Sequence, residues 1–227
     1  GWLMQIHSAL AGDSFLLNVG AGSGSYEPMD RMVVALEPSE LMIAQRPPGS
    51  APVVRGRAER LPFADRCFDA ALAVLTVHHW DDPEAGLAEL SRVAAKQVVV
   101  TWDPSVFASE FWLVRDYLPE AENREQGLAT ISTVQHCLRN AVSTPMPVPF
   151  GCTDGFFAAY WRRPHAYLDE RVRNAISGLA LLDQRLVKSA MGRLASDLAD
   201  GSWYERYSEL TGLEQLDLGY RIVVAES

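Results

Sequence analysis

The sequence predicts an α/β protein with a mostly parallel sheet and a helical insertion before the last strand. In the first hundred residues, short apolar runs alternate with connections long enough for helices. That alternation is typical of a parallel sheet covered by helices on both faces. The second half is mainly helical in pattern until residues 216–225, which have the composition of a strand.

Five apolar runs in the first half are expected to form strands. The first, residues 14–20, ends in glycine as a buried parallel strand often does. The second ends at Glu37 and is closed by Pro38, and the other three are residues 52–54, 68–77 and 97–102. Between the last two runs, Asp82 and Pro83 predict a helix start, because an acidic N-cap and a proline in the first turn are both favoured there.

The second half carries two amphipathic helical patterns. One runs from Ser105 to a stop at Pro119, and the other from Val187 to Leu198, with Gly201 placed as a C-cap. Between the two patterns, the proline-broken residues 146–150 suit an edge strand.

Charge and cysteine content exclude several classes of protein. The 227 residues hold 20 Lys and Arg against 29 Asp and Glu, a net charge of −9. Such a chain lacks the basic surface that nucleic acids and anionic membranes select, so we expect neither partner. The three widely spaced cysteines, with no C-x-x-C, indicate reduced thiols and no metal site. We therefore expect a cytoplasmic protein.

A glycine-rich turn follows the first expected strand. Gly20, Gly22 and Gly24 have the spacing G-x-G-x-G and not the G-x-G-x-x-G of dinucleotide sites. We expect this turn to open a helix and to leave amide N–H groups free for a ligand. Glu37, seventeen positions after Gly20, ends the second strand, where a carboxylate can accept both ribose hydroxyls. A tight turn beside an exposed Glu is the structural alternative.

A third block, residues 56–69, contains the pattern A-E-x-L-P-F and runs through the fourth expected strand to His78 and His79. Together with the glycine turn and Glu37, it resembles the class I S-adenosylmethionine-dependent methyltransferases. Within them it is most similar to the small-molecule, type 11 branch typified by ubiquinone and menaquinone biosynthesis enzymes. The resemblance covers residues 14–102. It implies a Rossmann-like, doubly wound, seven-stranded and mostly parallel sheet, with an antiparallel last strand and a helical substrate insertion.

The resemblance also implies how the chain is organised. It makes residues 1–227 a single methyltransferase domain, with residues 14–102 as its cofactor-binding core. The helical substrate or cap regions would be residues 103–145 and 151–212, and residues 216–225 the last strand. Family members normally have an upstream helix and lid, so the start at Gly1 leads us to expect further residues before it in the working enzyme.

The implied cofactor is S-adenosylmethionine, with S-adenosylhomocysteine as product. The residues expected to contact it are Asn18, Gly20, Ala21, Gly22, Glu37, Pro38, Ala58, Glu59, Val74 and Leu75. The glycine turn would line methionine and ribose, Glu37 would hold the ribose diol, and Ala58 and Glu59 would contact the adenine. The carbonyl of Val74 would meet the methionine amino group. Asn18 stands where the family usually has Asp or Glu, so the charge that would face the cofactor's ammonium group is missing.

Methyl transfer from a sulfonium is an in-line displacement, and the protein contributes mostly by alignment and exclusion of water. The resemblance places His79 at the floor of the reaction pocket, where it can serve as a general base if the acceptor must lose a proton. The alternative, that His78 and His79 only terminate a strand, is equally open. The aromatic and basic residues expected at the acceptor are Trp112, Tyr160, Trp161 and Arg162.

The sequence therefore predicts a methyltransferase that modifies an O, N or C atom of a small molecule, as a monomer or homodimer. The alternative is a catalytically impaired S-adenosylmethionine-binding regulatory or interaction protein, which Asn18 and the late start of the chain favour. An NAD-dependent oxidoreductase is disfavoured by the glycine spacing.

Overall fold

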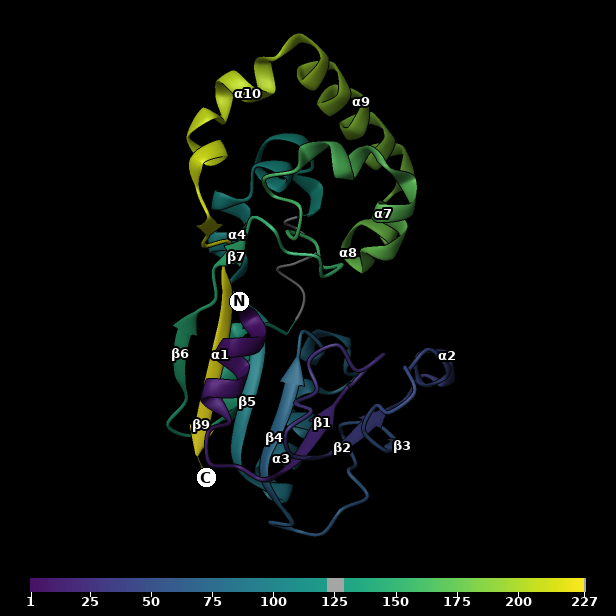
Figure 1. Ribbon diagram of the computed structural model, residues 1–227, viewed down its shortest axis with the longest axis vertical. Helices are drawn as coiled ribbons and strands as arrows, with labels where there is room; N and C mark the ends of the chain where they lie inside the picture. The colour runs from purple at the N-terminus through teal and green to yellow at the C-terminus, as the bar shows by residue number, and fades with distance from the viewer. Residues whose placement is uncertain (122–128, 227) are drawn as a thin grey trace. The chain divides into compact units, whose positions relative to one another are not determined.

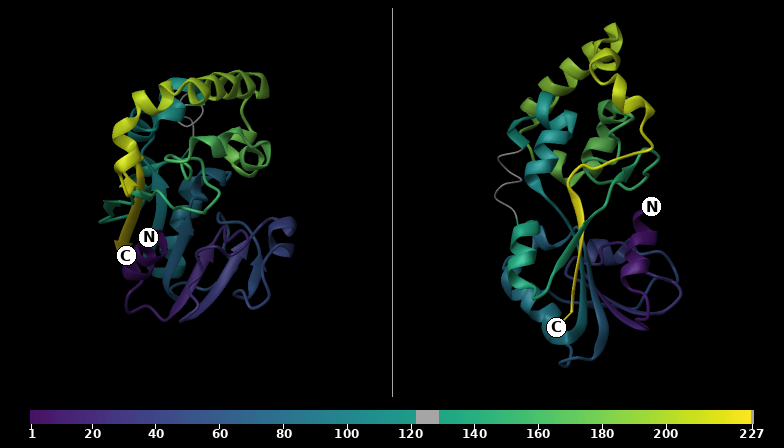
Figure 2. Two further views of the ribbon diagram at one scale, coloured as in Figure 1. Left: turned by 45° about the horizontal axis from the view of Figure 1, so that its top comes forward. Right: turned by 90° about the vertical axis from the view of Figure 1, so that its left-hand side faces the viewer.

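The computed structural model describes residues 1–121 and 129–226, and these divide into two compact units (Figures 1 and 2). The sheet unit comprises residues 1–103, 129–146 and 221–226. The helical unit comprises residues 104–121 and 147–220.

A seven-stranded sheet in the order β3-β2-β1-β4-β5-β9-β6 forms the centre of the sheet unit, counted over the described residues. Its strands are β1 (Phe15–Val19), β2 (Met32–Glu37), β3 (Val53–Arg55), β4 (Phe68–Val74), β5 (Ala94–Trp102), β6 (Val142–Pro145) and β9 (Tyr220–Glu226). Neighbours among β1 to β5 pair in parallel, whereas β9 and β6 pair antiparallel. The predicted fold class, with its antiparallel last strand, is confirmed.

Helices cover both faces of this sheet. Helix α1 (Trp2–Ala9) lies on one face, while α3 (Pro83–Val93) and α6 (Ile131–Cys137) lie on the other (Figures 1 and 2). Helix α3 begins as predicted: the side chain of Asp82 accepts from the N–H of Ala85, and a proline occupies the first turn. Its fully buried Leu87 and Leu90 join the apolar core under the strands, and each such burial contributes about 1.5–3 kcal/mol.

The connection from β1 to β2 differs from the prediction, because residues 20–31 form turns and no helix. Gly20, Gly22 and Gly24 have φ values of 67°, 51° and 91°. Consecutive right-handed helical turns are incompatible with such left-handed residues, and Pro28 removes a further backbone donor. The next connection holds only α2 (Glu40–Ala44), which buries none of its residues.

The helical unit contains short helices and a two-stranded ribbon. Its helices and helical turns are α4 (Pro104–Glu110), η2 (Leu113–Tyr117), η3 (Pro164–Leu168), α7 (Glu170–Ala175), α8 (Ser177–Ala180), α9 (Gln184–Asp200), α10 (Ser202–Arg206) and η4 (Ser208–Gly212). The ribbon pairs β7 (Val148–Pro149) with β8 (Gln215–Leu216), so the proline-broken segment does form an edge strand. Gly201 ends α9 with φ 88°, as predicted for a C-cap.

The predicted last strand, residues 216–225, is divided in the structure. Leu216 belongs to β8, and β9 begins only at Tyr220. Between them the N–H of Gly219 donates to Oδ1 of Asp217 at 3.0 Å, and Gly219 has φ 84°. A left-handed glycine and an Asp turn interrupt the extended chain, so the apolar pattern alone overestimated the strand.

None of the described helices is long and apolar enough to cross a membrane.

The segment between β3 and β4, which contains the L-P-F residues, is fastened to helix α3. Oε2 of Glu89 accepts from the N–H of Leu61 at 2.8 Å, and Arg92 donates to the carbonyls of Leu61 and Phe63 at 3.1 and 2.9 Å. Arg92 and Glu89 also form an ion pair at 2.6 Å. The bond from Arg92, together with that from Leu61, lowers the pKa of Glu89 below its ordinary 4.5, although burial opposes the shift.

We predict that Glu89→Gln destabilises the protein by about 1–3 kcal/mol near neutral pH, because it breaks bonds to a charged group. A carboxyl whose pKa is lowered by folding stabilises the protein above its unfolded pKa, and this contribution is lost as pH falls through the folded pKa. For Glu89 the loss occurs below its ordinary value of 4.5. Thermal unfolding followed by circular dichroism between neutral pH and about pH 3 measures it, and wild type should lose more stability on acidification than the variant.

Glu84→Gln, an exposed position in the first turn of the same helix, is the matched control. An equal loss of stability on acidification in wild type and the Glu89 variant would contradict the anchoring role of Glu89.

Candidate functional site

The carboxyl ends of β1, β2 and β4 gather the predicted cofactor residues. Strand β1 lies between β2 and β4, so the strand order reverses beside it. In open α/β sheets, ligands bind outside the carboxyl ends of the strands at such a point. Asn18 lies near the end of β1, Glu37 ends β2, and Val74 ends β4. The sheet therefore brings together residues that are far apart in the sequence.

Gly20 is packed against the connection that follows β4. A Cβ added to it would lie 2.8 Å from Cβ of Thr76 and closer still to its Oγ1, so no side chain fits. Its positive φ of 67° independently favours glycine. The N–H groups of Gly20 and Ala21 donate to the carbonyl of Leu36 at 2.8 and 3.1 Å. The turn is thus hydrogen-bonded to the end of β2 and packs against the connection after β4.

Glu37 is buried, with 6% of its surface exposed, and both its oxygens are oriented by backbone amides. Oε2 accepts from the N–H of Gly22 and Oε1 from the N–H of Ser39, each at 2.9 Å. A carboxylate oxygen can accept a second hydrogen bond, so both oxygens keep capacity for the hydroxyls of a ribose.

The expectation that the glycine turn leaves its N–H groups free is wrong for Gly20, Ala21 and Gly22. All three donate within the chain, the first two to Leu36 and the third to Glu37. Because no helix follows the turn, its amides point back to β2 and not toward a helix axis. These hydrogen bonds therefore fasten the turn to β2 without any ligand.

Sequence reasoning missed a buried ion pair next to this turn. Arg46 and Glu27 lie 2.7 Å apart, and their side chains are 5% and 6% exposed. Nδ2 of Asn18 donates to Oε1 of Glu27 at 3.2 Å. Neither charged residue belongs to a recognisable motif. The one signal in the sequence was an acidic residue, Glu27, close after the three glycines of the turn.

Ala58 and Glu59, the A-E pair of the motif, both have structural roles in the protein. Ala58 is buried, with 4% exposed. Oε1 of Glu59 accepts from the N–H groups of Asp81 and Asp82 at 2.8 and 3.3 Å, so its carboxylate holds the start of helix α3. The adenine contact expected of Glu59 stays a prediction.

Val74 and Leu75 follow at the end of β4. Leu75 has φ 49°, unusual for a branched residue, and its N–H donates to the carbonyl of Val100 at 2.9 Å. Strained backbone of this kind concentrates at functional sites. Pro38 is exposed directly after Glu37.

His79 ends the short turn η1 (Val77–His79) after β4 and is exposed. Its N–H donates to the carbonyl of Thr76 at 2.8 Å. The ring of His78 lies 3.9 Å from that of His79 and 4.7 Å from that of Trp102, centroid to centroid. The backbone bond suits a strand-terminating role, and the exposed ring suits a base, so both interpretations stay open.

The residues expected at the acceptor all lie in the helical unit. Trp112 and Trp161 are fully buried, and their indole N–H groups donate to the carbonyls of Trp161 and Val148 at 2.7 and 3.0 Å. This arrangement gives both tryptophans a packing role. Tyr160 and Arg162 are half-buried, and Arg162 donates to the carbonyl of Leu213 at 2.6 Å. That these four residues contact an acceptor stays a prediction.

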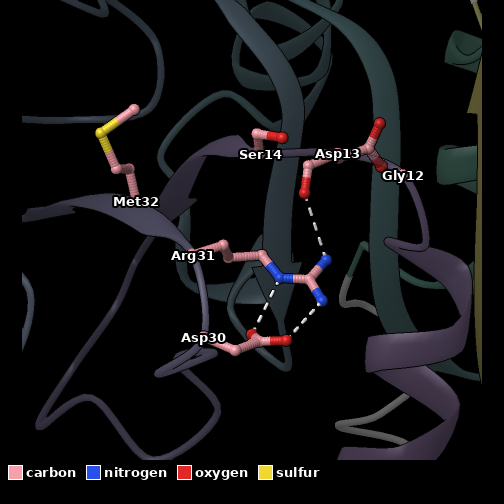
Figure 3. Close-up of a pocket in the computed structure, with 6 residues that line it drawn as sticks. All are labelled: Gly12, Asp13, Ser14, Asp30, Arg31 and Met32. Atoms are coloured by element: carbon pink, nitrogen blue, oxygen red, sulfur yellow. Dashed lines mark hydrogen bonds and ion pairs between the residues drawn. The ribbon is translucent and has the colours of Figure 1, made fainter.

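A pocket lies at the other end of these strands, the amino end (Figure 3). It is lined by Gly12, Asp13, Ser14, Asp30, Arg31 and Met32, which precede or begin β1 and β2. Arg31 points across it and donates to both oxygens of Asp30 at 2.9 Å. It lies at the amino ends of these strands, opposite the carboxyl ends where ligands of open α/β sheets bind. Across the described residues, His, Cys, Asp and Glu form no group of three or more that could hold a metal ion.

The fold is that of an open α/β protein whose strand order reverses at β1, and comparisons with known proteins identify the family. A family model described as a methyltransferase domain matches residues 17–100. A crystal structure of a putative methyltransferase from an antibiotic biosynthesis pathway of Anabaena variabilis is 30% identical, with a TM-score of 0.89. The match covers 100% of this chain and 96% of that one. The chain belongs to the class I S-adenosylmethionine-dependent methyltransferases.

Two further relatives are more distant. The uncharacterized protein YafE of Escherichia coli (strain K12) is 29% identical over 126 residues, which cover 51% of this chain and 58% of YafE. This chain thus matches a little over half the length of YafE. The [4+2]-cyclase SpnF is 16% identical with a TM-score of 0.52, and the match covers 100% of this chain and 80% of SpnF. That likeness shows the fold alone.

We predict that Gly20→Ala destabilises the protein by about 1–3 kcal/mol, because the new Cβ meets Thr76 and the positive φ becomes strained. Urea unfolding measures the change. Gly192→Ala is the matched control, since nothing lies within 4 Å of its added Cβ in helix α9. Alanine should stabilise there by about 0.5–1 kcal/mol. A Gly20 variant as stable as wild type would contradict the close packing of the turn.

Proposed function

We propose that the protein transfers the methyl group of S-adenosylmethionine to an O, N or C atom of a small molecule by in-line displacement. The observation that carries this proposal is the buried carboxylate of Glu37, held at the end of β2 by the amides of Gly22 and Ser39. Membership of the methyltransferase family supports it.

The residues at the carboxyl ends fit this cofactor. Ribose hydroxyls are donors, and Glu37 offers two oxygens that only accept. Gly22 has no side chain, and a Cβ there would make only ordinary contact with Met42, so the backbone is open to close approach. The residues proposed to hold the cofactor are Asn18, Gly20, Ala21, Gly22, Glu37, Pro38, Ala58, Glu59, Val74 and Leu75. When bound, S-adenosylmethionine supplies an electrophilic methyl group.

The chain itself contributes position and proton transfer. The turn at Gly20 is fixed by backbone bonds and by contact with Thr76, so Glu37 and its neighbours are oriented in advance. Such preorganisation lowers the entropic part of the barrier to an in-line displacement. His79, exposed after β4, is the proposed base for acceptors that must lose a proton.

The acceptor is proposed to meet residues of the helical unit. Tyr160 and Arg162 are the better candidates, since their side chains are only half-buried, and Trp112 and Trp161 act through packing. The structural neighbour from an antibiotic biosynthesis pathway supports including secondary metabolites among the acceptors tested.

We further propose that residues 1–227 act as one methyltransferase domain, whose sheet unit holds the cofactor. We propose that the enzyme is cytoplasmic and a monomer or homodimer. The net charge of −9 supports the absence of nucleic-acid and anionic-membrane partners.

We predict that Glu37→Gln weakens binding of S-adenosylhomocysteine by roughly tenfold or more, because a charged acceptor of the ribose hydroxyls is lost. Isothermal titration calorimetry measures the affinity. Glu40→Gln is the matched control, since that carboxylate is 74% exposed beyond the end of β2. An unchanged affinity in the Glu37 variant would refute the ribose assignment, and no heat with wild type would refute the proposed function.

We predict that His79→Ala lowers turnover by roughly a hundredfold for acceptors that must lose a proton, and leaves cofactor affinity unchanged. Transfer from labelled S-adenosylmethionine to a panel of phenols and amines, recorded from about pH 6 to 9, measures it. His136→Ala, an exposed histidine of helix α6, is the control. Wild-type turnover across the whole range would show that His79 only terminates the strand.

A further inference from the structure

No helix follows the glycine turn, and one arginine, Arg46, bonds to the turn instead. Arg46 lies just beyond helix α2, and its guanidinium bonds to two other segments of the chain, the turn at residues 20–31 and Ala51. Nη1 donates to the carbonyl of Gly22 at 3.2 Å, and Nη2 donates to both oxygens of Glu27 at 2.7 Å. Nη2 also donates to the carbonyl of Ala51 at 3.1 Å. The glycine turn is therefore joined to the segment that leads into β3.

Gly22 is held from both sides by charged groups. Its N–H donates to Glu37, and its carbonyl accepts from Arg46. The two peptide groups that flank Gly22 are thus fixed, one by the buried carboxylate proposed to bind ribose and the other by a buried guanidinium. A shift of Arg46 would move the partner that orients Glu37.

Asn18 adds a neutral hydrogen-bond donor to the ion pair of Glu27 and Arg46. Its amide donates to Oε1 of Glu27, whose two oxygens also accept from Arg46 and from the N–H of Ala51. An Asp at position 18 would place a second buried carboxylate beside Glu27, with one guanidinium to balance both. Like charges at such a distance repel strongly when water is excluded.

We propose that Asn18, Glu27 and Arg46 are positioning residues that hold the glycine turn in the shape that binds the cofactor. Asn18 is then the neutral donor that Glu27 requires, and an acidic residue in its place weakens the site. The identity of the ligand rests on the proposed function, but the cluster can be tested without ligand as well.

The test is a double-mutant cycle between positions 18 and 27. Asn18→Asp adds a negative charge to the cluster, Glu27→Gln removes one, and the double variant restores neutrality with the amide and carboxylate exchanged. Each protein is titrated with S-adenosylhomocysteine by calorimetry, and its thermal unfolding is recorded without ligand.

Each single variant should bind roughly tenfold more weakly than wild type and unfold at a lower temperature. The double variant should bind at least roughly threefold more tightly than either single variant and recover part of the unfolding temperature. Hydrogen exchange at the N–H of Gly22, measured without ligand, should be faster in each single variant and slower again in the double.

Asp13→Asn is the matched control, because it removes a carboxylate from another ion pair with largely covered side chains, that of Asp13 with Lys96, at the amino end of the strands. It should lower the unfolding temperature and leave the affinity for S-adenosylhomocysteine unchanged. Affinity in Asn18→Asp that equals or exceeds wild type, or a double variant no better than the weaker single, would overturn the positioning role. Wild type that releases no heat refutes the proposed function, and the cycle in unfolding temperature and exchange still tests the cluster.

Discussion

The bond between the N–H of Gly22 and the carboxylate of Glu37 is the constraint on which the rest of the site depends. It joins the turn after β1 to the end of β2, two segments that no helix connects. Removing a carboxylate from water is unfavourable unless its oxygens are bonded, so the buried Glu37 requires these amides as much as they require it. The turn and its acid therefore form one unit.

The same principle explains the acidic residues of the A-E-x-L-P-F block and its surroundings. Glu59, in the block, accepts from two amides at the start of α3. Glu89, in α3, accepts from the amide of Leu61 in the block. Each carboxylate fixes a loop that has no secondary structure of its own. The block thus reads in the sequence as a binding motif, and in the structure its acids fasten the loops around the site.

Local signals carried most of the fold prediction. The strands and the capped start of α3 at Asp82 follow from short-range rules that need only neighbouring residues. The same rules failed where left-handed backbone ends an element. Three left-handed glycines prevent a helix after β1, and Gly219 divides the last apolar run. The alternation of apolar residues does not report φ.

The site was predictable only as far as motifs reach. Glu37 and the glycine turn lie where the spacing placed them, but the partners of Glu27 lie nine positions before it and nineteen after it, outside any motif. The burial of Trp112 likewise depends on rings that pack against it from distant segments, those of Trp203 and Tyr167, and Trp161 is bonded to Trp112 and Val148. Pairings of this kind are set by the fold and not by spacing.

The role of Asn18 shows how such a pairing changes a functional argument. As an isolated departure from the family pattern, an amide in place of an acid suggested an impaired cofactor site. Beside Glu27 and Arg46 it is the residue that keeps the cluster neutral, because the one positive charge is already matched. A missing charge in a motif is therefore weak support for lost activity until the charges around it in space are counted. Counted this way, Asn18 no longer favours an inactive binding protein over a methyltransferase.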